Sequence, residues 1–165
     1  MGPARAIQVA GTVGASLIAW GCASYGGYTP GVSTMSDVRL KSGRPTDVRF
    51  SPGEEIWEYA TGPEGVETYV IAFDSNGVMR SDEQVLTLEN IRRLVPGGTT
   101  REETRKLLGR PGDVSMMNGK EVWEWRFRPF GFIPEILAVS FGQDGVVTDV
   151  ARVPESIGGS NKGGK

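Results

Sequence analysis

The sequence contains no histidine and only one cysteine, Cys22, among its 165 residues. Without histidine the chain lacks the commonest general base, the Ser–His and Cys–His nucleophile pairs, and most kinds of zinc site. A single cysteine excludes an intramolecular disulfide and a cysteine-cluster metal site. A hydrolase built on this chain would depend on carboxylates, lysine or tyrosine, so we expect a protein that is not an enzyme and binds no metal and no cofactor.

An excess of positive charge is also missing. The chain carries 18 Lys and Arg against 20 Asp and Glu, which gives a formal net charge of -2. Because nucleic-acid binding needs a concentrated positive field, this balance argues against a nucleic-acid partner. The basic residues between Arg92 and Arg110 are interleaved with Glu102 and Glu103, which is typical of a solvated helix surface.

The N-terminus has the pattern of a secretory signal peptide. Arg5 gives a positive start, and the stretch from Ala6 to Trp20 is uncharged and mostly apolar. At about fifteen residues this stretch is shorter than the roughly 20 that a helix needs to cross a bilayer. Two alternatives remain, a cleaved signal that leaves Cys22 unmodified and an uncleaved anchor.

Cys22, directly behind the apolar stretch and preceded by Gly21, resembles the lipobox of bacterial lipoproteins. By that resemblance the signal peptide is residues 1–21, and Cys22 begins the mature chain and carries acyl groups. Several acyl chains, at about 0.8 kcal/mol per buried methylene, hold a protein to a membrane. In lipoproteins of this kind, Ala23 in place of Asp implies transfer to the outer membrane. Residues 22–29 would form a short tether.

The chain contains an internal duplication with an offset of 66 residues. SGRPTDV at 42–48 and LGRPGDV at 108–114 agree at five of seven positions. EIWEY at 55–59 matches EVWEW at 121–125 without a gap, and FDSNGV and FGQDGV match after a further shift of two residues. Several blocks in one order indicate two copies of a structural unit, which we place at 30–84 and 85–153. The tail from 154 to 165 is expected to be disordered.

Each unit is predicted to be α+β, with a short helix packed on a three-stranded antiparallel meander. Thr100 and Glu103 form a capping box at the helix start, and Thr34 and Asp37 form a weaker one. The strands follow, joined by a tight turn that contains Gly. An extra helix is expected in the second unit only, at 87–94. The residues expected to have structural roles are Gly43, Pro45, Gly109 and Pro111 at the helix ends and Trp57 and Trp123 in the cores.

These elements resemble the SmpA/OmlA (BamE-like) family of outer-membrane lipoproteins. That family has a lipidated Cys, then a helix with Gly and Thr at its start and Gly-x-Pro at its end. A strand with Trp-x-Tyr and a hairpin with Phe, Gly and Val follow. The second unit shows this order from Thr100 through Trp123 to Phe141 and Gly145. The resemblance implies tandem BamE-like units over residues 30–152.

The two units differ most between two of their strands. The first unit has polar TGPEGVE at 61–67, where the second has RFRPFGFIP at 126–134. Apolar side chains rimmed by arginine are typical of binding sites, so one interpretation is contact with a partner or with lipid head groups. The other interpretation is internal packing of this loop. The candidate contact residues are Arg126, Phe127, Arg128, Phe130, Phe132 and Ile133.

The resemblance implies a non-enzymatic lipoprotein of the outer membrane that faces the periplasm and supports envelope integrity. Its partners would be envelope proteins, including subunits of the β-barrel assembly machine, and the membrane through its acyl chains. A second hypothesis is a periplasmic inhibitor or sensor that clasps a soluble enzyme. Tandem units of a similar fold in a secreted β-lactamase-inhibiting protein favour that alternative.

Overall fold

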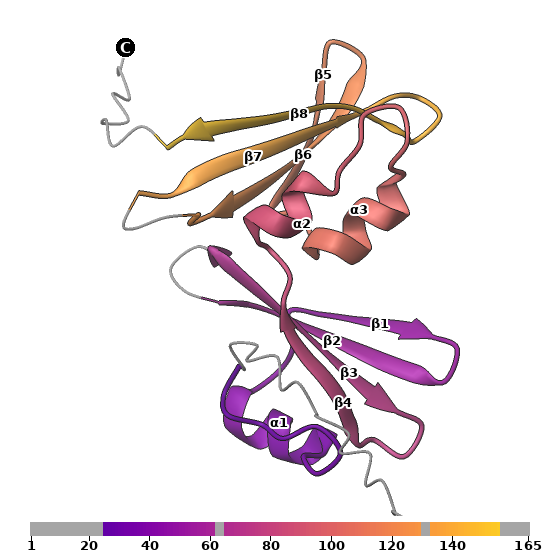
Figure 1. The fold of residues 1–165 in the computed structure, drawn as a ribbon, viewed down its shortest axis with the longest axis vertical. Coiled ribbons are helices and arrows are strands. Elements are labelled where there is room, and N and C mark those ends of the chain that lie inside the picture. The colour runs from indigo at the N-terminus through magenta and orange to yellow at the C-terminus, as the bar shows by residue number, and fades with distance from the viewer. Residues whose placement is uncertain (1–24, 62–64, 130–132, 156–165) are drawn as a thin grey trace, which may run out of the picture.

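The computed structural model describes residues 25–61, 65–129 and 133–155. It is an α+β structure with two four-stranded antiparallel sheets and three short helices in this part of the chain. Helices α2 and α3 lie between the two sheets, and α1 lies on the outer side of the first sheet (Figure 1). Cys22 and the signal-like segment before it lie outside the described residues.

The first unit contains α1 and the sheet β1-β2-β3-β4, and the second contains α2, α3 and the sheet β5-β6-β7-β8. Each sheet is a meander in which every strand pairs with the next one along the chain. The elements of the first unit are α1 Met35–Ser42, β1 Asp47–Ser51, β2 Glu54–Thr61, β3 Glu67–Asp74 and β4 Met79–Gln84. Those of the second are α2 Leu88–Arg92, α3 Arg101–Leu108, β5 Asp113–Met117, β6 Lys120–Phe127, β7 Glu135–Phe141 and β8 Val147–Pro154. Strand β8 thus includes Pro154, which the sequence analysis placed in the tail.

The prediction of three strands per unit is wrong, because an additional edge strand begins inside each repeated GRPxDV block. The backbone amide of Thr46 donates to the carbonyl of Glu58 at 2.7 Å, and that of Gly112 donates to Glu124 at 2.8 Å. Each bond places the Asp-Val that follows beside the next strand, so β1 and β5 form. The repeated motif therefore serves to end a helix and to start a strand.

Both helices of the duplicated motif have complete capping boxes. The backbone amide of Thr34 donates to Asp37 Oδ2 at 2.8 Å, and that of Thr100 donates to Glu103 Oε2 at 2.8 Å. The shorter aspartate thus closes the box as well as the glutamate does, so the expectation of a weaker box in the first unit is wrong.

An aromatic side chain of the sheet contacts the end of each of these helices. Tyr59 Oη donates to the carbonyl of Gly43 at 3.2 Å, and Trp125 Nε1 donates to that of Gly109 at 3.2 Å. Both glycines have positive φ, 76° and 80°. The offset of 66 residues relates all four positions, so the helix is fastened to the sheet in the same way in both units.

The two tryptophans at matched positions have equivalent surroundings. Trp57 Nε1 donates to Glu55 Oε1 at 2.7 Å, and Trp123 Nε1 donates to Glu121 Oε1 at 2.6 Å. Each ring packs against a phenylalanine of the neighbouring strand with centroids 4.8 Å apart. Trp57 is buried and Trp123 is half-buried. The structure therefore supports a duplicated unit at the level of individual side chains.

Residues 25–28 pack on the first unit, although the sequence analysis assigned them to a tether. Tyr28 is 8% exposed and belongs to the same core cluster as Val38. The Tyr25 ring stacks on Tyr69 with centroids 4.8 Å apart. At the offset of 66, Tyr28 corresponds to Leu94, which is 7% exposed beside α2. Two tyrosines thus occupy the place that the α2 segment fills in the second unit.

A buried carboxylate joins the two units. Glu58 is 1% exposed, and by the alternation of side chains along β2 it points to the face of the first sheet opposite α1. Arg105 of α3 donates from Nη1 to Glu58 Oε2 at 2.6 Å and pairs through Nη2 with Asp47 at 2.5 Å. The backbone amide of Arg110 donates to Glu58 Oε1 at 2.5 Å. A Cβ at Gly109 would lie 2.6 Å from Thr68 Cγ2. The close approach between the end of α3 and strand β3 therefore requires glycine at this position.

A Glu58→Gln substitution should destabilise the protein, because it leaves the half-buried Arg105 guanidinium with only Asp47 for charge balance. Breaking a buried ion pair costs about 3–5 kcal/mol, and retention of the amide oxygen brings the expected loss to about 2–3 kcal/mol. Urea unfolding followed by tryptophan fluorescence measures it. Glu124→Gln is the matched control: this position is repeat-equivalent, no ion pair within the described residues involves it, and the expected change is within about 0.5 kcal/mol. Equal losses in both variants would contradict the assigned role of Glu58.

Asp82 is a second buried carboxylate, with 6% of its surface exposed. The pKa of Asp82 is raised to about 6, mainly by burial; the nearby backbone amide of Tyr25 offsets part of the increase, and the charge of Glu83 adds to it. Neither carboxylate oxygen has a hydrogen bond of normal geometry within the described residues. An ionised Asp82 therefore lowers the stability of the first unit at neutral pH.

The pKa of Asp82 predicts a stability that falls with rising pH. The folded pKa of about 6 lies above the unfolded value of about 3.9, so this group contributes most stability below pH 4, and that contribution is lost as the pH rises through 6. Asp82→Asn should remove this slope and stabilise the protein at pH 8 by about 2–3 kcal/mol. Unfolding midpoints in urea at pH 5 and pH 8 test it, and a variant with the same pH dependence as the unsubstituted chain would refute it.

Candidate binding groove

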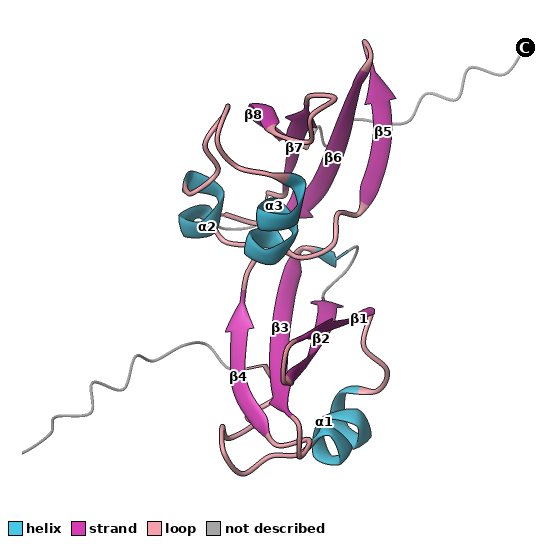
Figure 2. Ribbon diagram, turned by 90° about the vertical axis from the view of Figure 1, so that its right-hand side faces the viewer, coloured by secondary structure: helices cyan, strands magenta, loops and turns pink. Residues whose placement is uncertain are grey.

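A groove lies between the edge strand β1 of the first unit and helix α3 of the second. Its volume is about 980 Å³. Figure 2 shows α3 above the first sheet. Residues of β1, β2 and the turn between them line the groove on the side of the first unit. The lining residues are Val48, Arg49, Phe50, Ser51, Pro52 and Ile56 from the first unit and Arg101, Glu102, Arg105, Lys106 and Trp123 from the second.

The charges in this groove are predominantly positive, and one of them has no direct ion pair. Arg101 pairs with Glu121 at 2.8 Å, Arg105 is held at the junction, and Lys106 pairs with Glu102 at 2.7 Å. Arg49 makes no ion pair within the described residues, and its buried Nε has no hydrogen-bond partner there. Burial lowers the pKa of Arg49 and the nearby Arg105 lowers it further, while the carboxylates of Glu58 and Asp47 raise it in part. The groove therefore offers the half-buried Arg49 guanidinium to an anion, next to the two carboxylates that Arg105 engages.

The same groove has apolar side chains at its outer edge. Phe50 is 77% exposed and Val48 is 39% exposed, and both project from β1. This strand is the edge of its sheet, so its outer backbone groups are available to pair with an added extended chain. An apolar ring, a cation without an ion pair in the described part of the chain, and a strand at the edge of its sheet together suit an extended segment that carries acidic residues.

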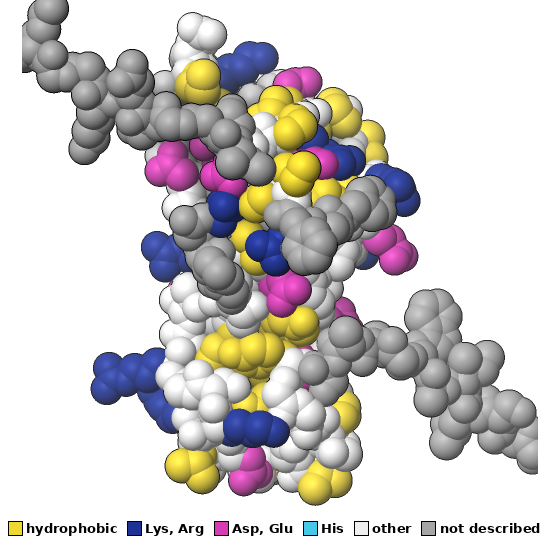
Figure 3. All heavy atoms as spheres, turned by 90° about the vertical axis from the view of Figure 1, so that its left-hand side faces the viewer, with side chains coloured by type: hydrophobic (Ala, Val, Ile, Leu, Met, Phe, Trp, Pro, Cys, Tyr) yellow, Lys and Arg dark blue, Asp and Glu magenta, His cyan; other side chains and the backbone are white. Residues whose placement is uncertain are grey.

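Positive charge is distributed differently elsewhere on the surface. On the opposite side of the molecule, Lys and Arg side chains are scattered among acidic and hydrophobic ones (Figure 3). None of the described helices is long and apolar enough to span a bilayer. Within residues 25–61, 65–129 and 133–155, no group of three or more His, Cys, Asp and Glu side chains could hold a metal ion.

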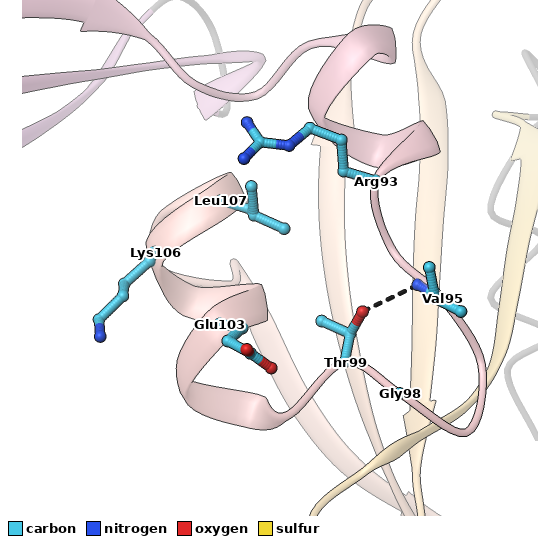
Figure 4. Close-up of a pocket in the computed structure, with 7 residues that line it drawn as sticks. All are labelled: Arg93, Val95, Gly98, Thr99, Glu103, Lys106 and Leu107. Carbon is cyan, nitrogen blue, oxygen red and sulfur yellow. Dashed lines mark hydrogen bonds between the residues drawn. The ribbon is translucent and has the colours of Figure 1, made fainter.

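A second hollow, of about 560 Å³, lies between α3 and the loop that follows α2 (Figure 4). Its polar groups are already engaged: Thr99 Oγ1 accepts from the backbone amide of Val95 at 2.8 Å, and Glu103 closes the capping box of α3. Leu107 and Arg93 point toward each other across it. Because few free polar groups converge here, this hollow is a weaker candidate than the groove.

The candidate contact residues of the sequence analysis do not form one surface. Phe127 is 1% exposed and belongs to the core of the second unit, so its assignment to a contact surface is wrong. It alternates with Arg126 along β6 and therefore points to the same face as Trp125. Arg126 pairs with Glu155 at 2.6 Å, while Arg128 and Ile133 are exposed. Phe130 and Phe132 lie outside the described residues.

Sequence reasoning missed Arg49 and Phe50. The alternation of charged and apolar residues in DVRFS is a strand signal that could have identified β1, though not its place at the edge of the sheet. No local signal places α3 beside it, because the two segments are some fifty residues apart in the chain.

No protein-family model matches this sequence. No curated protein matches it either. Among solved structures, the chain is similar to the crystal structure of a DUF4309 family protein (YjgB) from Bacillus subtilis, with 20% sequence identity and a TM-score of 0.31. The match covers 79% of this chain and 84% of that one. At this TM-score the similarity supports no argument about function.

Proposed function

We propose that the protein is a non-enzymatic outer-membrane lipoprotein that faces the periplasm and binds an acidic, extended segment of a partner envelope protein in the groove between β1 and α3. The observation that carries this proposal is Arg49, a half-buried cation without an ion-pair partner in the described residues, beside the exposed ring of Phe50. A cation that is already desolvated gives a carboxylate more attraction than a fully hydrated one does.

The mode of binding follows from the edge position of β1. A segment that adds to this edge would gain backbone hydrogen bonds, and its alternate side chains would meet Arg49 or Phe50. The ion pairs of Arg105 fix α3 relative to β1, so the two walls of the groove are held in place before binding. Such preorganisation reduces the entropic cost of association.

The placement in the outer membrane depends on the lipobox-like sequence at Cys22, and the tandem BamE-like assignment depends on the repeated motifs. The partners that this assignment favours are envelope proteins, including subunits of the β-barrel assembly machine. The enzyme-clasping alternative uses the same groove and differs in the partner that it predicts.

Arg49→Glu should abolish capture of the partner, because a carboxylate in the groove repels an acidic segment. The full-length lipidated protein, used as bait on solubilised envelope, should lose at least about tenfold of the captured partner. Arg92→Glu makes the same charge change on the exposed face of α2, outside the groove, and should capture as the unsubstituted protein does. A far-ultraviolet circular dichroism melt confirms that both variants fold.

Undiminished capture by Arg49→Glu would exclude the groove as the binding site. A single soluble hydrolase in the eluate would favour the enzyme-clasping alternative, and barrel-assembly subunits would favour the envelope role. The mass of the mature N-terminal peptide tests the anchor separately, since acylation at Cys22 and removal of residues 1–21 both change it.

A further inference from the structure

We propose that copies of this chain associate head to tail, with α1 of one copy docked on the outer face of sheet β5–β8 of the next. The junction between the two units inside one chain is the basis of this inference. There, the face of the first sheet that carries Asp47 and Glu58 receives Arg105 and Gly109 from α3. Because the units are duplicates, the same two surfaces occur a second time in each chain.

The acidic half of the junction recurs on the second sheet. At the offset of 66 residues, Asp47 corresponds to Asp113 and Glu58 corresponds to Glu124. Neither Asp113 nor Glu124 makes an ion pair within the described residues, and Glu124 lines a hollow of about 390 Å³ on the outer face of the sheet. Among the described residues, no helix covers that face (Figure 1). The second sheet thus presents the same carboxylates as the first, without the helix that neutralises them there.

The basic half of the junction recurs on α1. Arg39 corresponds to Arg105, Gly43 to Gly109 and Arg44 to Arg110. With no ion pair in the described part of its own chain, the Arg39 guanidinium lies over the Trp57 ring, 5.6 Å from the centroid. Gly43 has a positive φ like Gly109, and no atom of the described residues lies within 4 Å of the place of its missing Cβ. This side of α1 can therefore approach a sheet as closely as α3 does.

The edge of the proposed contact between copies is more apolar than the edge of the junction inside one chain. Leu40 of α1 is 91% exposed and occupies the position of Lys106, while Met116 of β5 is 68% exposed and occupies the position of Phe50. Exposure of a leucine side chain to water on a short helix is energetically unfavourable in an isolated chain. Docking on the next copy brings Leu40 close to the exposed edge of β5, where Val114 and Met116 lie.

The positions of the two surfaces determine how many copies can associate. The two surfaces lie on opposite ends of the molecule, on the outer sides of α1 and of sheet β5–β8 (Figure 1). A contact between different surfaces is heterologous, so each added copy presents a new free face and association does not stop at a dimer. The complex is a stack of alternating helices and sheets that continues the order already present in one chain.

Paired charge reversals test this contact in the full chain, purified in a mild detergent and followed by sedimentation velocity over a wide concentration range. The unsubstituted chain should grow beyond two copies with increasing concentration. Arg39→Glu and Glu124→Arg should each raise the concentration needed by at least about tenfold. The double variant should recover most of the loss, because the two reversed charges then attract each other across the contact. Arg92→Glu, a charge reversal off both surfaces, should leave assembly unchanged.

Three results would overturn the proposal. The first is an unsubstituted chain that stays single at every concentration. The second is association that stops at two copies. The third is a pair of single reversals without effect, or a double variant no better than either single one. Circular dichroism of each variant excludes unfolding as the cause of a loss.

Discussion

The arrangement of this molecule depends on one buried carboxylate. Glu58 faces away from its own helix and is satisfied by groups of the other unit, the Arg105 side chain and the backbone amide of Arg110. Burial of a carboxylate that is 1% exposed is costly without such partners, so this contact favours the position of α3 against the first sheet. The remaining features follow from this constraint: α3 is fixed beside β1, the groove between them has stable walls, and Gly109 can approach Thr68 closely.

The proposed binding role and the proposed self-association both rest on the duplication. The two units carry equivalent residues on equivalent surfaces, and one pair of these surfaces meets inside the chain. The groove at the internal junction carries Arg49 and Phe50, whereas the equivalent positions on β5 are Ser115 and Met116. The proposed specificity for an acidic partner therefore rests on residues of the internal groove that the second unit does not repeat. The outer faces retain the carboxylates and the arginine that suit another copy.

Much of the local structure could be predicted from the sequence, because its causes are local. Capping boxes, the glycines that end helices and the glycine-containing turns each depend on a few neighbouring residues. β1 and β5 were missed because each is a five-residue edge strand placed by bonds from Thr46 and Gly112. The packing of Tyr25 and Tyr28 was missed because a short Gly-containing segment has no periodicity. Neither the groove nor the Glu58 junction could be predicted, since both join segments that are distant in sequence.

The central claim is that the two units are joined by an ion pair at one repeat position and not at its duplicate. A double-mutant cycle between Glu58 and Arg105, with the equivalent cycle between Glu124 and Arg39 in the same chain under dilute conditions, tests it most directly. The account predicts a coupling free energy of about 2 kcal/mol or more for the first pair and a value near zero for the second. Additive effects for Glu58 and Arg105 would contradict the account, because the two units would then not be held together by this contact.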